Sequence, residues 1–165
     1  MKNVKLIAMD VDGVLTDGSI IYGAGDIEIK VFCVKDGQGI TLARRARIEI
    51  AFITARVSDA LVKRANDLGV IEVHQGVKDK LDCLEKIIKR YNLKNEEILY
   101  IGDDIVDIPV MKNVGYPVAV ADAADEVKEI AKYITKKPGG RGAVRETIDM
   151  VLKAQNKYNS LVEKK

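Results

Sequence analysis

Short apolar runs alternate along the chain with segments in which apolar residues recur at helical spacing. The runs cover residues 5–9, 49–53, 70–73, 98–101 and 116–120. Between two of them, Leu61, Ala65 and Leu68 share one face of a predicted helix that Gly69 ends. Strands that alternate with helices of this length indicate βαβ units, whose parallel strands form a sheet with helices on both faces. We therefore predict an α/β fold: a single doubly wound, Rossmann-like parallel-sheet domain spanning residues 1–165.

Residues 19–32 interrupt this alternation and predict a β-hairpin insertion around the turn at residues 23–26. The second strand alternates apolar with charged residues: Ile27, Ile29 and Val31 against Glu28 and Lys30. One face of the hairpin is therefore apolar. Because a lone hairpin is marginally stable in water, something must cover that face. The rest of the chain is one candidate, and we favour other copies of the chain.

Composition and charge are those of a globular protein, with 47% hydrophobic and 32% charged residues and a formal net charge of +2. This balance gives no indication of a nucleic-acid or membrane partner. Cys33 and Cys83 lie far apart in the sequence and form no CxxC motif, so we expect free thiols without a functional role, in a reducing compartment. With no leader and no apolar stretch of about 20 residues, a cytoplasmic location is expected. Residues 143–165 predict a C-terminal helix that frays into a polar tail.

Carboxylates and one hydroxyl follow three of the predicted strands: Asp10 and Asp12, then Thr54, then Asp103 and Asp104. Parallel strands present these positions at one edge of the sheet, where ligands bind. Each acidic turn taken alone is also explained as a helix cap. Taken together, the carboxylates repel one another unless a cation lies between them. Hard oxygen ligands of this kind favour Mg²⁺ with a phosphate-bearing substrate.

Lys80 begins a predicted helix over residues 80–91 and is a candidate to reach the same edge. Its ammonium group and the Thr54 hydroxyl would then bind the oxygens of a phosphoryl group. The ordinary alternatives are a solvated surface lysine and a local turn hydrogen bond. His74 lies near a strand end outside these motifs, and we interpret it as structural.

Four motifs, taken in chain order, resemble the signature of the haloacid-dehalogenase-like hydrolase superfamily. They are Asp10-Val-Asp12-Gly13, Ile53-Thr54, Lys80 and Gly102-Asp103-Asp104-Ile-Val-Asp107. The resemblance implies a phosphomonoester hydrolase in which Asp10 forms an aspartyl phosphate and Asp12 is the general acid and base. It implies that Thr54 and Lys80 bind the phosphoryl oxygens. It also implies a Mg²⁺ cofactor held by Asp10, Asp12 and Asp103, with Asp104 and Asp107 in support.

Further segments narrow the resemblance: residues 10–18, 36–40, Gln75-Gly76 before Lys80, and 139–146. They resemble phosphatases without a cap domain that act on an eight-carbon acid sugar phosphate in lipopolysaccharide synthesis. Ala55 departs from the pattern, which usually has glycine there. The resemblance implies a homotetramer with its hairpins packed together, and substrate binding by Arg56, Asp36, Gly37 and Arg141. It also implies that the segment 139–142 reaches a neighbouring subunit's active site, whereas by itself this segment predicts a flexible basic loop.

Three other functions remain open at this point. A phosphatase for a nine-carbon acid sugar phosphate, such as N-acylneuraminate 9-phosphate, would use the same chemistry. A receiver domain also carries an acidic Mg²⁺ site, but its phosphorylated aspartate ends a later strand, whereas here the DxDG motif follows the first. A non-catalytic scaffold would gain nothing from the repulsion among the carboxylates.

Overall fold

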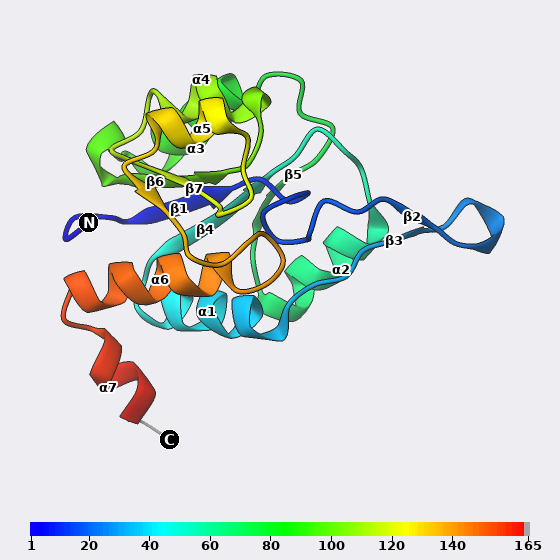
Figure 1. Cartoon of the computed structure of the whole chain (residues 1–165). Coiled ribbons are helices and arrows are strands. Elements are labelled where there is room, and N and C mark those ends of the chain that lie inside the picture. Colours follow the sequence, from blue (N-terminus) through cyan, green and yellow to red (C-terminus); the bar gives the residue numbers. More distant parts are fainter. Residues whose placement is uncertain (164–165) are drawn as a thin grey trace.

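The computed structural model describes residues 1–163, which form a parallel sheet between two helical layers (Figure 1). The six strands lie in the order β5-β4-β1-β6-β7-β8, and every pair is parallel. Their bounds are β1 Leu6–Met9, β4 Glu49–Ile53, β5 Glu72–His74, β6 Ile98–Gly102, β7 Tyr116–Ala119 and β8 Tyr133–Ile134. The predicted doubly wound α/β fold is confirmed.

Helices cover both faces of this sheet. The α-helices are α1 Val34–Arg45, α2 Asp59–Leu68, α3 Lys80–Tyr91, α4 Ile108–Met111, α5 Asp125–Ile130, α6 Ala143–Ala154 and α7 Tyr158–Glu163. Three 3₁₀ turns add η1 Ala24–Asp26, η2 Asn95–Glu97 and η3 Ile105–Asp107. In Figure 1, α3, α4 and α5 lie on one side of the sheet, and α1 and α6 pack together on the other. Among the described residues, no helix has the length and apolarity needed to cross a bilayer.

The central strands are buried on both faces, which explains why their sequences are continuously apolar. β1 pairs with β4 and β6, so that Met9 lies opposite Phe52 on one side and Ile101 on the other. The residues that follow these strand ends are therefore neighbours at the carboxyl edge of the sheet. This register is what positions the functional side chains described below.

The predicted elements differ from the observed ones mainly at their ends. The apolar run at residues 70–73 forms a shorter strand, β5, which is shifted toward the carboxyl end. The helix with Leu61 begins at Asp59 and ends at Gly69, whose φ of 66° is the left-handed conformation that glycine adopts most readily. β8 was not predicted because its two residues are too few to show a period.

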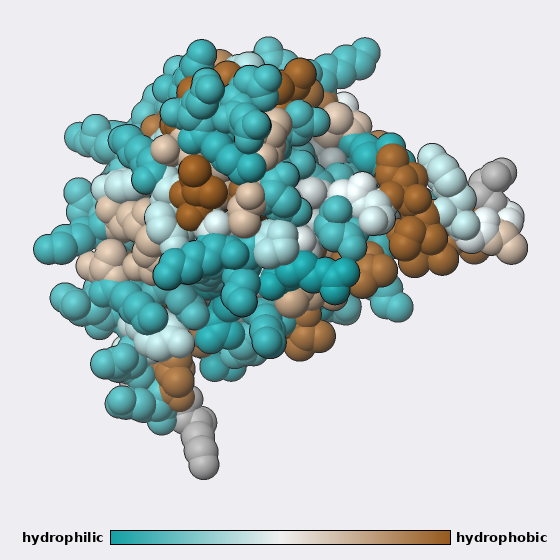
Figure 2. Space-filling model, viewed as in Figure 1, coloured by the Kyte–Doolittle hydropathy of each residue, from teal (hydrophilic) through white to brown (hydrophobic). Residues whose placement is uncertain are grey.

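The predicted hairpin is present as β2 (Ile21–Tyr22) paired antiparallel with β3 (Glu28–Ile29). It projects away from the sheet, and Figure 2 shows hydrophobic atoms over this projection. Tyr22 is 71% exposed, and Ile27 and Val31 are 62% and 61% exposed. The rest of the described chain thus leaves the apolar face of the hairpin uncovered.

The glycine-rich segment before α6 is packed against the loop that follows β1. The amide of Gly139 donates to Asp122 Oδ1 at 2.9 Å, and the amide of Gly140 donates to the Val14 carbonyl at 2.9 Å. A Cβ atom on Gly139 would lie 1.7 Å from the carbonyl oxygen of Gly13. The expectation of a flexible loop was wrong, because these glycines allow two backbone segments to touch.

We expect Gly139→Ala to lower the free energy of unfolding by about 3 kcal/mol, since its methyl group would collide with backbone. Gly25→Ala is the matched control, because Gly25 has a positive φ of 72° but nothing within 4 Å of the added carbon. That variant should lose only about 1 kcal/mol. Urea unfolding measures both, and equal losses would contradict the close packing at Gly139.

Candidate active site

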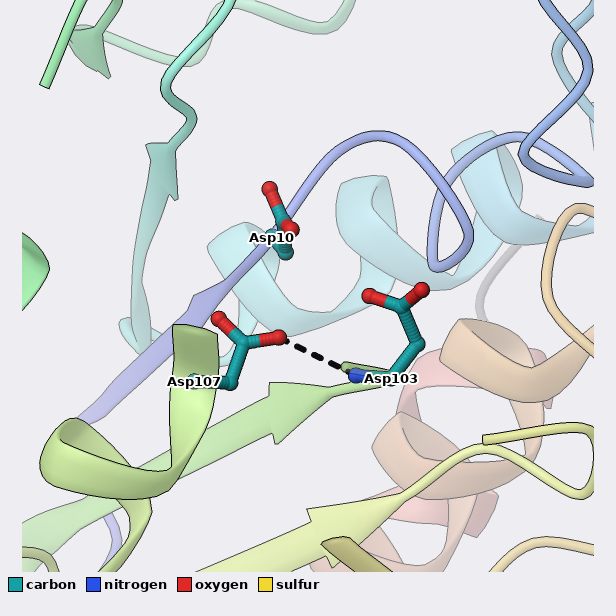
Figure 3. Close-up of side chains that lie close together, drawn as sticks. All are labelled: Asp10, Asp103 and Asp107. Carbon is teal, nitrogen blue, oxygen red and sulfur yellow. Dashed lines mark hydrogen bonds between the residues drawn. The ribbon is translucent and has the colours of Figure 1, made fainter. Parts of the chain in front are cut away.

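Three carboxylates meet at the carboxyl edge of the sheet (Figure 3). Asp10 follows β1, Asp103 follows β6, and Asp107 ends η3. One oxygen from each lies within 4.8 Å of the others. The Asp103 amide donates to Asp107 Oδ2 at 3.1 Å, the contact drawn in Figure 3. The sequence prediction that separate strand ends bring acidic residues to one place is confirmed by this geometry.

Lys80 lies inside this cluster, not on the surface. Its Nζ atom is 2.7 Å from Asp10 Oδ2 and 2.8 Å from Asp107 Oδ1, and the side chain is buried. The preceding Asp79 caps α3 by accepting from the amide of Asp82 at 3.0 Å, which makes Lys80 the first helical residue. The helix start therefore aims the ammonium group at the carboxylates.

Asp107 is the most fully bonded of the three carboxylates. Besides Lys80 and the Asp103 amide, its Oδ1 atom accepts from the Tyr100 hydroxyl at 2.8 Å. Asp104 is exposed, and its side chain accepts from the amide of Ile105 at 2.7 Å, so it caps η3. These bonds fix the positions of both side chains, and their support of a bound metal stays a prediction.

The cluster carries more negative charge than its single ammonium group balances. Burial, followed by the charges of its acidic neighbours, raises the pKa of Asp103 to about 8. The same two causes, partly opposed by Lys80, raise the pKa of Asp10 to about 6. Asp103 Oδ1 is buried and has no hydrogen-bond partner among residues 1–163. A buried, unpartnered carboxylate oxygen beside other carboxylates fits a hard divalent cation such as Mg²⁺.

Asp12, two residues after Asp10, lies against the hairpin. Its Oδ1 atom forms a hydrogen bond and an ion pair with the ammonium group of Lys30, which lies just beyond the end of β3. Sequence reasoning missed Lys30 and its neighbour Glu28. The signal was present in the alternation of charged and apolar residues along residues 27–31, but that pattern does not say what the charged face contacts.

Thr54 directly follows β4 and is buried at the same edge. Its amide donates to the His74 carbonyl at 2.9 Å, and its hydroxyl oxygen accepts from the Arg56 amide at 3.2 Å. Its own hydroxyl hydrogen forms no bond with the described residues, so it is available to a ligand. His74 itself bonds to Glu72 at 2.7 Å, which fits its structural interpretation.

The predicted substrate-binding residues divide into two groups. Arg56 forms an ion pair with Glu28, and Arg141, whose side chain is 68% exposed, lies 3.4 Å from Asp17 of its own chain. Asp36 is 1% exposed, and its oxygens accept from the amides of Gly142 and Arg145 at 3.1 and 2.7 Å. Gly37 packs against α2. The structure gives Asp36 a structural role at the start of α6 and Gly37 a packing role against α2, and their contact with substrate stays a prediction.

The raised pKa values of Asp10 and Asp103 predict how stability depends on pH without metal. The folded state holds these protons above the ordinary carboxyl pKa of 3.8, whereas the unfolded chain releases them. The free energy of unfolding should therefore fall as pH rises from about 4 to about 8. Added Mg²⁺ should stabilise the protein more at pH 8 than at pH 5, because its ligands must be deprotonated.

Thermal unfolding with EDTA and with Mg²⁺ across this range measures both effects. Asp103→Asn is the control, since it removes the group with the larger shift and should flatten the pH dependence. An equally steep pH dependence in that variant would contradict the assignment.

The sequence and the structure of this chain both match those of known phosphatases. Residues 41–148 match the model of the haloacid dehalogenase-like hydrolases. The 3-deoxy-D-manno-octulosonate 8-phosphate phosphatase of Yersinia pestis is 44% identical over 155 residues, which cover 94% of this chain and 83% of the relative. The phosphatase of the same name from Escherichia coli K12 is 43% identical, covering 96% of this chain and 84% of its own.

Solved structures agree. The Yersinia pestis phosphatase superposes with a TM-score of 0.94 at 44% identity, over 96% of this chain and 85% of that one. The Moraxella catarrhalis phosphatase, solved with a magnesium ion, a phosphate ion and the sugar acid KDO, gives a TM-score of 0.95 at 39% identity, over 98% and 92% of the two chains. The predicted enzyme class, a phosphomonoester hydrolase, is confirmed by these relatives. The chain belongs to the haloacid dehalogenase-like hydrolases.

Proposed function

We propose that this chain hydrolyses 3-deoxy-D-manno-octulosonate 8-phosphate to the free sugar acid and phosphate, in the synthesis of lipopolysaccharide precursors. One observation carries the proposal: a complete cluster of Asp10, Asp103, Asp107 and Lys80 occurs in a chain that matches phosphatases of this name over nearly its whole length. The predicted cofactor, Mg²⁺, agrees with the magnesium-bound relative and with this acidic cluster.

In the first step, a carboxylate oxygen of Asp10 attacks phosphorus, and the bond from phosphorus to the sugar oxygen breaks. Asp12 gives its proton to the departing alkoxide, so the free sugar leaves as an alcohol. The product on the enzyme is an aspartyl phosphate at Asp10. Splitting one difficult displacement into two easier steps is the general advantage of a covalent intermediate.

In the second step, a water molecule attacks the phosphorus of the aspartyl phosphate while Asp12 takes its proton. The bond from phosphorus to Asp10 breaks, which regenerates the carboxylate and releases inorganic phosphate. Acid–base help of this kind contributes about 10²- to 10⁴-fold in rate. Asp12 thus ends the cycle protonated, ready for the next substrate.

The remaining residues hold the phosphoryl group. Lys80 and the hydroxyl of Thr54 donate to its oxygens, which gather negative charge during transfer. Mg²⁺ would be held by the Asp10 side chain, the Asp12 backbone carbonyl and Asp103, and when bound it neutralises part of that charge. Asp107 would support Asp103 by accepting from its amide, and Asp104 caps η3, which carries Asp107.

Recognition of the sugar acid would use arginine. Arg56 lies two residues beyond Thr54, and Arg141 stands on the glycine-rich segment packed beside the loop after β1. A guanidinium group binds a carboxylate with paired hydrogen bonds, and the substrate carries a carboxylate at the end opposite its phosphate. In this chain Arg141 lies beside its own Asp17, so a reach into a neighbouring subunit stays a prediction.

A phosphatase for a nine-carbon acid sugar phosphate remains the alternative of the same chemistry. A receiver domain is less well supported because Asp10 and Asp12 follow the first strand, β1. A non-catalytic scaffold is less well supported because the buried Lys80 inside the carboxylate cluster suits phosphoryl transfer. We also propose a cytoplasmic location, with which the free thiols of Cys33 and Cys83 agree.

The test is phosphate release from 3-deoxy-D-manno-octulosonate 8-phosphate with Mg²⁺, beside N-acylneuraminate 9-phosphate. EDTA should abolish release, and Asp10→Asn should lower kcat by about 10³-fold or more, because it removes the nucleophile. Lys80→Met should lower kcat by about 10²-fold or more, since a buried donor to the phosphoryl oxygens is lost.

Lys78→Met is the matched control for Lys80, because Lys78 is exposed two residues away, and its kcat should stay unchanged. A clear preference for the nine-carbon ester would overturn the proposed substrate. Release that survives Asp10→Asn would overturn the nucleophile.

The exposed apolar face of the hairpin supports a homotetramer in which hairpins of different subunits pack together. We expect Ile29→Lys to weaken assembly, because Ile29 is 45% exposed on that face and a charge there would have to be buried. Light scattering measures the mass in solution. Val57→Lys is the control, being 72% exposed outside the hairpin, and a tetramer that survives Ile29→Lys unchanged would contradict the assignment.

A further inference from the structure

The second strand of the hairpin turns its charged residues toward the active site and its apolar residues toward solvent. Glu28 and Lys30 are largely buried, with side chains 17% and 3% exposed, whereas Ile27 between them and the turn is 62% exposed. This is the reverse of the usual arrangement, in which charged residues take the outer face. The charged face must therefore have partners that offset the cost of burial.

Lys30 finds those partners in two carboxylates. Its ammonium group forms an ion pair with Asp12 Oδ1 and another with Glu28 Oε1 at 2.8 Å. Glu28 Oε2 in turn accepts from the guanidinium of Arg56. Alternating charges thus link the loop after β1, the hairpin and the loop after β4. A nearly buried ammonium group with two carboxylate partners is held firmly, because leaving it unpaired would be costly.

The contact with Lys30 involves only one of the two oxygens of Asp12. Oδ1 is bonded to Lys30, while Oδ2 is buried and has no donor among residues 1–163. The side chain is therefore fixed at one oxygen, and the other oxygen remains available to exchange a proton. A carboxylic acid that protonates a leaving group needs both properties: a set orientation and an oxygen that nothing else occupies.

We propose that Lys30 is a positioning residue of the phosphatase reaction, which holds Asp12 so that Oδ2 gives and takes the proton. The proposal rests on the proposed function, because it takes Asp12 as the general acid and base. Lys30 does not contact the phosphoryl group in this assignment, and its effect on the rate passes through Asp12.

A purely structural role is the competing explanation, since Lys30 also ties the hairpin to the body. The two roles differ in their dependence on the leaving group. An alkoxide needs a proton as it departs, whereas nitrophenolate is stable without one. A misplaced Asp12 therefore slows the first step, which kcat/KM reports, much more for an alkyl phosphate than for p-nitrophenyl phosphate, but a distorted hairpin slows that step alike for both. The second step is the same for every ester and does not enter kcat/KM.

The experiment compares Lys30→Met, Lys30→Arg and Asp12→Asn with the unchanged chain on three esters: the octulosonate 8-phosphate, glycerol phosphate and p-nitrophenyl phosphate. Lys30→Met should lower kcat/KM, which covers the steps up to departure of the leaving group, by about 10- to 100-fold on the two alkyl esters and by less than about threefold on p-nitrophenyl phosphate. Lys30→Arg keeps a cationic donor and should recover most of the loss. Lys63→Met, an exposed position on α2, is the control and should change neither rate.

A double variant tests the route through Asp12. Adding Lys30→Met to Asp12→Asn should change kcat on the alkyl esters by less than about twofold, because the group that Lys30 positions is already gone. Thermal unfolding gives a readout independent of turnover: the shifts in Tm of the two single variants should not add in the double variant. Additive shifts would show that the two side chains do not interact in solution.

The outcomes separate the two proposals. If glycerol phosphate is hydrolysed and the octulosonate ester is not, the proposed substrate fails while the test of Lys30 proceeds. If no ester is hydrolysed, the proposed function fails, and Lys30 has no reaction to serve. Equal losses of kcat/KM on alkyl and aryl esters in Lys30→Met, or no rescue by arginine in a folded variant, would overturn the positioning role.

Discussion

Repulsion among buried carboxylates at one edge of the sheet is the constraint around which this structure is arranged. Asp10 and Asp103 are brought together by the parallel register of β1 and β6, and η3 places Asp107 beside them. Lys80 offsets part of the repulsion from the start of α3. The rest is left to a cation, so the acidic cluster is built to be completed by what it binds.

The same edge shows how three distant segments are interlocked. Gly13 approaches the Asp103 carboxylate so closely that an added Cβ would lie 2.0 Å from its Oδ2 atom. Gly139 in turn packs against the carbonyl group of Gly13. The loop after β1 is thereby confined between the end of β6 and the segment before α6. Such confinement, together with the hydrogen bond from the Val11 amide to Asp10 Oδ1 at 2.6 Å, keeps the Asp10 carboxylate in place.

Much of this could be predicted from the sequence, because the determining signals are local. Continuous apolar runs identify the central strands, and the residues after them must share an edge once the strands are parallel. That rule and the family resemblance together predict the active-site positions of Asp10, Thr54, Lys80 and Asp103. The burial of Lys80 did not follow, since a lysine at a helix start reads equally well as solvated.

What the sequence left open concerns contacts between segments far apart in the chain. Asp36 sits inside a conspicuous glycine-containing motif, yet its oxygens serve the amides at the start of α6. Lys30 lies in an alternating strand whose charged face could equally have met water. The spacing of residues along the chain does not predict the partners of Asp36 or of Lys30, because each contact depends on how separate elements pack together.

The alternation along β3 also limits how the hairpin can change in evolution. Successive side chains point to opposite faces, so inserting or deleting one residue between Gly25 and Lys30 without a compensating bulge would exchange the faces. Isoleucines would then replace the charged pair at Asp12, and the charges would move to the outer surface. The hairpin can therefore accept substitutions and changes in its turn, but the length of its second strand can change only by two residues at a time. A segment outside the central sheet thus has its length fixed by a contact with Asp12 at the edge of that sheet.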